Sequence, residues 1–144
     1  MISKREMPNK IKKEKYLDLN IRIVDNKENM TATAVRIIDY SFDIDNNINN
    51  TFIEFWIGRR FIGGICGMEL HSEFFLDILF VNEKYRNQGY GTKLIEYLKN
   101  KYKKIEVEST PEATDFYKKC GFFNTKSQSS RIYANTKLMR YNGK

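Results

Sequence analysis

The most constraining feature of this chain is the stretch from Leu79 to Gly91, LFVNEKYRNQGYG, which joins an apolar strand to an amphipathic helix. The apolar run ends at Val81, a short polar turn follows, and Gly89 and Gly91 then open the helix. The first turn of a helix presents unpaired backbone N–H groups and the positive end of the helix dipole, which together attract anions. The stretch is therefore a candidate phosphate-binding turn, and the alternative is an ordinary connection between a strand and a helix.

Two common phosphate-binding loops do not fit this turn. A dinucleotide-binding loop of the Rossmann type would place a third glycine where this chain has Leu94. A P-loop ends in Gly-Lys-Ser/Thr, and the sequence contains no such triplet. Arg86 stands just before the glycines, where a guanidinium can pair with a phosphate oxygen, and Thr92 adds a hydroxyl group. A phosphate bound here would therefore be held in a different way.

The apolar periodicity of the chain predicts an α/β (α+β) fold built on one mixed sheet. Leu17, Leu19, Ile21 and Ile23 alternate with polar residues, the period of a half-buried strand. The run 74–81 is apolar except for Asp77, which is typical of a central strand covered on both faces. The predicted strands are 17–23, 52–57, 61–70, 74–81, 105–108, 122–126 and 132–138, and the predicted helices are 31–42, one after Gly91, and 111–119.

The length of 144 residues suits one domain with a hydrophobic core, which we expect to occupy residues 16–144. Lys10, Lys12, Lys13 and Lys15 make residues 1–15 a basic N-terminal arm or a frayed first element. No apolar run approaches the ~18 residues of a membrane span, and the first residues are charged rather than apolar. We therefore expect a cytoplasmic protein without a membrane partner.

Composition narrows the chemistry further. Cys66 and Cys120 are too few for a disulfide framework and lack metal-ligand spacing with the single His71, so no metal is expected. The net charge of +7 favours acidic partners, among them nucleic acid or a polyphosphate cofactor. The chain lacks the basic-aromatic and zinc-finger patterns of common nucleic-acid-binding modules, so we rank that function far below the others.

Three blocks of sequence together resemble one family. The loop 86–91, RNQGYG, is similar to the acetyl-CoA pyrophosphate loop of the GNAT N-acetyltransferase superfamily. The block 110–122, TPEATDFYKKCGF, resembles a later helix of that family with its Phe-Tyr-x-x-x-Gly-Phe signature, and Gly63-Gly64-Ile65 resembles its glycine-containing strand. The resemblance covers roughly residues 17–140. Asn82 replaces the proline found in many members, and Cys120 replaces an aliphatic residue.

The resemblance implies a central, mostly antiparallel mixed sheet of about six or seven strands, flanked by helices and splayed at its central strands. It also implies acetyl-CoA as co-substrate, with the pantetheine arm lying along residues 79–81 and the pyrophosphate on backbone N–H groups of residues 87–92. The N–H of Phe80 or Val81 would polarise the thioester carbonyl. The implied cofactor-binding residues are Leu79, Phe80, Val81, Arg86, Asn87, Gln88, Gly89, Tyr90, Gly91 and Thr92.

The same resemblance implies direct transfer of an acetyl group to an amine within a ternary complex. Tyr117 is then the proton donor to the departing thiolate, since the reference pKa values of phenol and thiol, ~10 and ~8.5, are close. Asp77 is the candidate general base, because a carboxylate inside an apolar strand requires a reason. A structural hydrogen bond or salt bridge of Asp77 is an equal alternative, and Glu54 and Glu69 are weaker candidates.

The acceptor is a primary amine of a small molecule or peptide, and the sequence does not identify it. The resemblance places its pocket near residues 37–50 and 123–131, where Asp39, Asp43 and Asp45 favour a cationic amine. A non-catalytic member that binds CoA only as a structural or sensing ligand is the main alternative function. A homodimer remains open.

Overall fold

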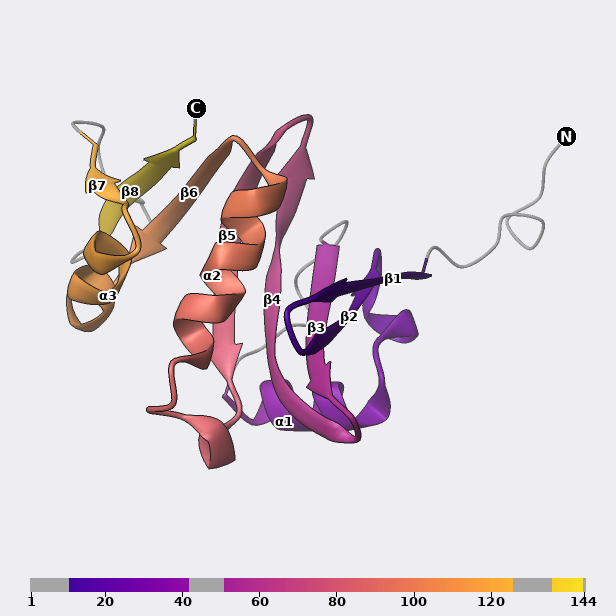
Figure 1. Cartoon of the computed structure of the whole chain (residues 1–144). Coiled ribbons are helices and arrows are strands. Elements are labelled where there is room, and N and C mark those ends of the chain that lie inside the picture. Colours follow the sequence, from indigo (N-terminus) through magenta and orange to yellow (C-terminus); the bar gives the residue numbers. More distant parts are fainter. Residues whose placement is uncertain (1–10, 42–50, 126–135, 144) are drawn as a thin grey trace, which may run out of the picture.

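The computed structural model describes residues 11–41, 51–125 and 136–143 and shows one sheet with helices on both faces (Figure 1). Its strands are β1 (Ile11–Tyr16), β2 (Leu19–Val24), β3 (Thr51–Ile57), β4 (Arg60–Leu70), β5 (Glu73–Val81), β6 (Lys104–Ser109), β7 (Phe123–Asn124) and β8 (Lys137–Asn142). Its helices are α1 (Ala32–Ser41), α2 (Tyr90–Lys101) and α3 (Thr114–Lys119), with short 3-10 turns η2 (Lys27–Asn29), η3 (Glu83–Tyr85) and η4 (Pro111–Ala113).

The eight strands form a single sheet in the order β1-β2-β3-β4-β5-β6-β8-β7. Every neighbouring pair is antiparallel except β5 and β6, which are parallel because α2 connects them. The predicted mixed α/β fold with a mostly antiparallel sheet is therefore confirmed, although the described residues alone form eight strands rather than six or seven.

The additional strand comes from a hairpin at the N-terminal end of the described chain. β1 pairs with β2 along its whole length, so residues 11–15, which we assigned to a basic arm or a frayed first element, belong to the sheet. Leu17 sits in the hairpin turn with φ of 57° and a mostly exposed side chain. Its apolar character made it appear to be the first residue of a longer strand. Residues 1–10 of the predicted arm lie outside the described residues.

α1 and α2 lie on opposite faces of the sheet (Figure 1). Gly63 and Gly64 are neighbours on β4, so their side-chain positions point to opposite faces. A Cβ on Gly63 would meet Leu94 of α2, whereas a Cβ on Gly64 would meet Ile38 of α1. At Gly63 a Cβ would also overlap the Phe80 carbonyl oxygen, so the close approach of β5 requires glycine there. At Gly64 a Cβ would lie 3.0 Å from the end of the Ile38 side chain, which leaves little room on the α1 side.

Two hydrophobic clusters fill these faces. The α2-side core includes the buried residues of α2 and α3, among them Leu94, Leu98 and Tyr117. The α1-side core consists of Val24, Met30, Ala34, Ile38, Phe52, Phe61, Cys66, Ile78 and Phe80.

A β-bulge interrupts the pairing of β4 with β5 at Asp77. Ile78 lies opposite Cys66 and Leu76 lies opposite Gly67, so Asp77 is the additional residue on β5. An additional residue reverses the alternation of side chains in the remainder of a strand.

This reversal explains how one apolar strand serves both cores. Phe74 and Leu76, before the bulge, pack in the α2-side core, while Ile78 and Phe80, after it, pack in the α1-side core. Leu79 then returns to the α2 side, where it packs against that core. The prediction that residues 74–81 form a central strand covered on both faces is confirmed.

β5 and β6 separate at the bulge. Their parallel ladder covers four pairs and ends at Leu76 opposite Val107, although β5 continues to Val81. β6 instead continues in antiparallel pairing with β8 up to Ser109. The second half of β5 therefore has a strand neighbour on one edge only, as the predicted splay requires.

The chain end differs in detail from the prediction. β8 begins at Lys137, so the strand expected at residues 132–138 starts later, and residues 132–135 lie outside the described part of the chain. β7 contains only Phe123 and Asn124 and pairs with β8.

Candidate functional site

The turn between β5 and α2 combines two positive-φ residues with a free helix terminus. Asn87 has φ of 64°, and Gly89, with φ of 85°, precedes the first residue of α2. The first hydrogen bond of the helix runs from the Lys93 N–H to the Gly89 carbonyl at 3.2 Å. Within the described residues, none of the backbone N–H groups of residues 87–92 donates a hydrogen bond.

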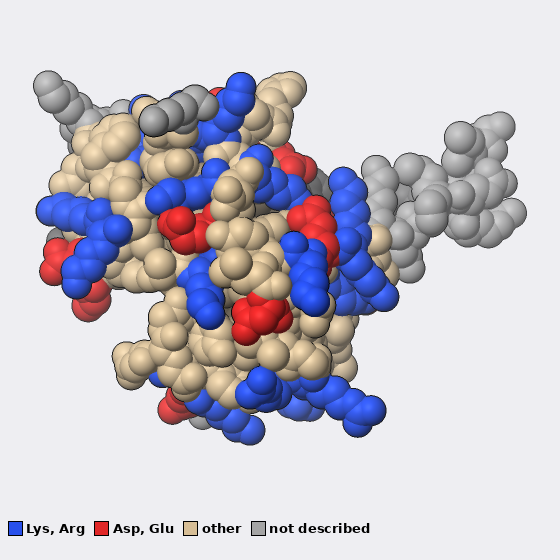
Figure 2. Space-filling model, viewed as in Figure 1, with Lys and Arg blue, Asp and Glu red and all other residues tan. Residues whose placement is uncertain are grey.

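This turn lines a surface pocket of about 420 Å³. In the space-filling view the surface is indented between α3 and the turn that precedes α2 (Figure 2). Most of the residues predicted to bind the cofactor line this pocket, namely Leu79, Val81, Arg86, Asn87, Gly89, Tyr90, Gly91 and Thr92. Its walls are thus formed by the open end of β5 and the first turn of α2.

Phe80 and Gln88 are the predicted cofactor residues that do not line the pocket. The Phe80 side chain lies on the opposite face, in the α1-side core. The backbone N–H of Phe80 points toward β4 and away from the pocket. Asn82 donates its N–H to the Ile62 carbonyl of β4 at 2.8 Å, and the backbone groups of residues two apart in a strand point to the same edge. Phe80 and Val81 are the two residues whose N–H groups could polarise a thioester carbonyl. Only the N–H of Val81 faces the edge of β5 that is not paired with β6.

Arg86 is held at the end of β5 by two contacts. Its Nε donates a hydrogen bond to the Val81 carbonyl at 2.8 Å, and its guanidinium carbon lies 5.4 Å from the centre of the Phe80 ring. These contacts hold the guanidinium group of Arg86 beside the pocket through its Nε, so its two terminal nitrogens are not used in the hydrogen bond to Val81. An anchored guanidinium loses little freedom when it binds a phosphate.

Tyr85 and Phe116 also line the pocket, although neither was assigned to the site from the sequence. The ring of Phe116 is half-buried and packs against the α2-side core. It also lies over Gly91, where a Cβ would be 3.3 Å from the ring. The family resemblance could have indicated a place for Phe116 in the site, because Phe116 belongs to the same sequence motif as Tyr117.

Tyr117 occupies the α2-side core, where its ring packs against Phe116 and Phe122. Burial, with a smaller contribution from Cys120, raises the pKa of the Tyr117 hydroxyl, so the group is protonated at neutral pH. The hydroxyl has no hydrogen-bond partner among the described residues. The side chain of Tyr117 is buried, with 6% of its surface exposed. Tyr117 does not line the pocket.

Asp77 lies where β5 and β6 separate, one residue beyond the last pair, Leu76 and Val107. Glu108, the residue after Val107, is close enough to interact with it electrostatically. Much of the Asp77 side chain is exposed, but its carboxyl group is partly shielded from water. This loss of hydration, followed by repulsion from Glu108, raises the pKa of Asp77. Glu108 is itself held by a hydrogen bond from Oγ1 of Thr136 at 3.2 Å.

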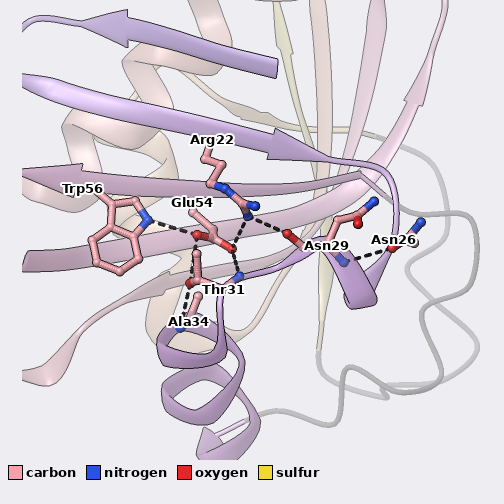
Figure 3. Close-up of polar contacts among 7 residues, drawn as sticks. All are labelled: Arg22, Asn26, Asn29, Thr31, Ala34, Glu54 and Trp56. Carbon is pink, nitrogen blue, oxygen red and sulfur yellow. Dashed lines mark hydrogen bonds and ion pairs between the residues drawn. The ribbon is translucent and has the colours of Figure 1, made fainter. Parts of the chain in front are cut away.

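The weaker base candidates have structural partners instead. Glu54 is fully buried beneath the start of α1, where it accepts hydrogen bonds from Thr31 and Trp56 and pairs with Arg22 (Figure 3). Glu69 accepts a hydrogen bond of 2.6 Å from the hydroxyl of Tyr102.

The predicted acidic acceptor region is only partly described. Asp43 and Asp45 lie outside the described residues, as does the side chain of Asp39. Across the described ranges, no group of His, Cys, Asp and Glu side chains is suited to a metal ion. No helix there is long and apolar enough to cross a membrane.

Comparison with known proteins identifies the class to which this fold and pocket belong. The family model of the acetyltransferase (GNAT) domain matches residues 26–141, and the chain therefore belongs to the GNAT acetyltransferase family. No curated protein sequence matches the chain.

Solved structures agree with this fold. An acetyltransferase of Bacillus subtilis in complex with CoA aligns with a TM-score of 0.63 at 16% identity, covering 86% of this chain and 98% of the other. An acetyltransferase of Streptococcus agalactiae aligns with a TM-score of 0.62 at 16% identity, covering 88% and 99%. The PaiA N-acetyltransferase of Thermoplasma acidophilum, in complex with coenzyme A, aligns with a TM-score of 0.52 at 17% identity, covering 69% and 64%.

Proposed function

We propose that this GNAT-family protein transfers an acetyl group from acetyl-CoA to a primary amine of a small molecule or peptide. The observation that carries the proposal is the row of backbone N–H groups of residues 87–92 at the start of α2, beside Arg86, which donate to no acceptor in the described part of the chain. Such an arrangement suits a pyrophosphate, because it supplies several donors together with the helix dipole. Two of the structural relatives are CoA complexes, which supports the same ligand here.

The thioester arm would lie along the open edge of β5. Backbone groups of Leu79 and Val81 face that edge and would pair with the amides of the pantetheine arm, as a neighbouring strand does. The Val81 N–H would then donate to the thioester carbonyl and stabilise the oxyanion that forms when the amine attacks. The amine attacks in the ternary complex, without an acyl-enzyme.

Tyr117 would act on the leaving group. A phenol whose pKa is raised by burial is a weaker acid than its reference value suggests, so complete proton transfer to the thiolate is less favourable. We assign Tyr117 the role of a hydrogen-bond donor that stabilises the departing sulfur and delivers the proton as the thiol forms.

Asp77 would accept the proton of the attacking amine. A carboxylate is a better base when its pKa is raised toward neutrality, and Glu108 contributes to that rise. The position of Asp77 at the separation of β5 and β6 is consistent with access from the solvent.

Binding of acetyl-CoA is the direct test of the proposed function. At 100 times its dissociation constant, acetyl-CoA is expected to stabilise the native state by about 2.7 kcal/mol. For a domain of this size, that corresponds to an increase in melting temperature of about 5–10 °C, measured by differential scanning fluorimetry. Acetyl-pantetheine, which lacks the pyrophosphate, is the control ligand and should produce a much smaller shift. An unchanged melting temperature at saturating acetyl-CoA contradicts the proposal.

Turnover then requires an acceptor panel. Polyamines, aminoglycosides, amino acids and peptides with free N-termini cover the main chemical classes of primary amine, and released CoA reports transfer to any of them. Release of CoA that depends on the amine distinguishes an enzyme from a protein that only binds CoA.

Replacing Glu108 by Gln is expected to move the acid limb of the pH–rate profile to lower pH. Asp77 must be deprotonated to act as a base, and removal of the neighbouring negative charge lowers its pKa. The measurement is the pH dependence of kcat/KM. Glu106→Gln is the matched control, because Glu106 lies on the same strand but pairs with Arg140. An acid limb that does not move in Glu108→Gln would remove Asp77 as the titrating base.

A further inference from the structure

A second pocket, of about 620 Å³, lies beside α1 at the same end of β5. Its lining residues come from α1, from the end of β5 and from the segment that follows, namely Arg36, Ile37, Phe80, Asn82, Glu83, Lys84 and Arg86. The side chain of Phe80 belongs to the α1-side core, so this pocket opens on the face of the sheet opposite α2. Its volume falls within the range typical of small-molecule sites.

The lining of this pocket, which we call the α1 pocket, is cationic. Arg36, Lys84 and Arg86 contribute three positive charges, and Glu83 contributes one negative charge. None of the three cations forms an ion pair with a carboxylate among the described side chains, which do not include that of Asp39. Unpaired guanidinium groups in a concave surface attract carboxylates or phosphates, which they bind through paired hydrogen bonds.

The α1 pocket adjoins the acetyl-CoA pocket. Arg86 lines both of them, because its guanidinium is fixed between the Val81 carbonyl and the Phe80 ring. Ile37 and Phe80 add apolar walls, which suit an organic molecule better than a bare inorganic anion. A ligand in the α1 pocket would therefore lie next to the strand along which the thioester arm is proposed to bind.

We infer that the α1 pocket receives the anionic end of the acceptor, and that the preferred acceptor is an amine carrying a carboxylate or phosphate group. This inference rests on the proposed function. Asp77, the proposed base, precedes Phe80 by three residues on β5, or about 10 Å at ~3.3 Å per residue. The amine and the anion of the acceptor are thus several bonds apart, as in a short acidic peptide.

The experiment compares anionic amines with neutral and cationic counterparts of similar shape. The probes are glycyl-glycyl-phosphoserine amide and glycyl-glycyl-glutamate, set against glycyl-glycyl-serine amide, glycyl-glycyl-glutamine amide and spermidine. Release of CoA gives kcat/KM for each probe, and the melting temperature of the CoA-saturated protein reports binding independently of turnover. At least one anionic probe is expected to bind and to be acetylated with a kcat/KM about tenfold or more above that of its neutral counterpart.

Arg36→Ala tests the role of the pocket, and Lys103→Ala is its control. Arg36 is exposed on α1, where alanine favours the helix, so the variant is expected to fold. It should raise the KM for the anionic probe about tenfold or more and leave the KM for acetyl-CoA unchanged. Lys103→Ala removes the same charge from an exposed position after α2, outside both pockets, and should change neither KM.

Three outcomes would overturn the inference. One is that neutral or cationic amines are acetylated better than anionic ones, and another is that neither anionic probe raises the melting temperature of the CoA-saturated protein. The third is that Arg36→Ala weakens CoA but not dephospho-CoA, which would assign the pocket to the 3′-phosphate of the donor. If acetyl-CoA itself fails to bind, the proposed function is wrong. If acetyl-CoA binds and the anionic probes do not, only this inference is wrong.

Discussion

Replacing Tyr117 by Phe is expected to lower kcat about 10- to 100-fold, the effect of losing one hydrogen bond to a developing thiolate. The KM for acetyl-CoA should change little, because the change removes only the hydroxyl. The ring contacts with Phe116 and Phe122, which hold the side chain in the core, remain possible for phenylalanine. Steady-state CoA release with the best acceptor of the panel measures both constants.

Tyr141→Phe is the matched control for this prediction. Tyr141 also packs against Phe122, and its hydroxyl can be removed without changing the pocket residues. The control should retain the kcat of the parent protein. An unchanged kcat in Tyr117→Phe would reject the assignment of Tyr117, and an equal loss in both variants would indicate a packing effect.

Replacing Glu54 by Ala is expected to destabilise the fold by about 3–5 kcal/mol, the usual result of removing one partner of a buried ion pair. Both carboxylate oxygens of Glu54 are engaged. Oε2 accepts from the Thr31 N–H at 2.8 Å and lies 3.6 Å from Nη1 of Arg22, while Oε1 accepts from Oγ1 of Thr31 and Nε1 of Trp56 (Figure 3). Alanine would leave these donors without their partner and leave a cavity beneath α1.

The expected decrease in melting temperature is roughly 10 °C or more, and chemical denaturation should give the free energy of unfolding directly. Glu96→Ala is the control, because Glu96 forms only a surface ion pair with Lys99 and its removal should cost less than about 1 kcal/mol. If Glu54→Ala were as stable as Glu96→Ala, the buried network would not hold α1 in place.

Most of the fold was predictable because its elements have strong local signals. The alternation of Ile21 and Ile23 and the helical spacing of Leu94 and Leu98 each report burial on one face, and the structure places these residues in the core. Leu17 misled the prediction because a single exposed apolar residue in a turn continues the strand pattern. Periodicity reports hydrophobicity and carries no information about φ.

The candidate site was predictable only as far as it is contiguous in sequence. Residues 86–92 form one turn, so their joint position beside a pocket follows from the chain itself. The neighbouring charges of Asp77 and Glu108 depend on strand pairing between residues 31 positions apart, and the α1 pocket depends on how α1 crosses the sheet. No local pattern encodes those distances, which is why Glu108 and Arg36 were not among the predicted residues.

The bulge at Asp77 makes this residue independent of the pairing that sets the faces of the strand. Substituting the residue keeps the count, so Phe74 and Phe80 continue to serve opposite cores. Deleting it would place Ile78 directly after Leu76, and these two residues already lie opposite the consecutive residues Cys66 and Gly67 of β4. The regular pleat would then return, with Leu79 still on the α2 side and Phe80 still on the α1 side. A loss of length at the bulge therefore leaves both cores intact, because the additional residue lies outside the pairing.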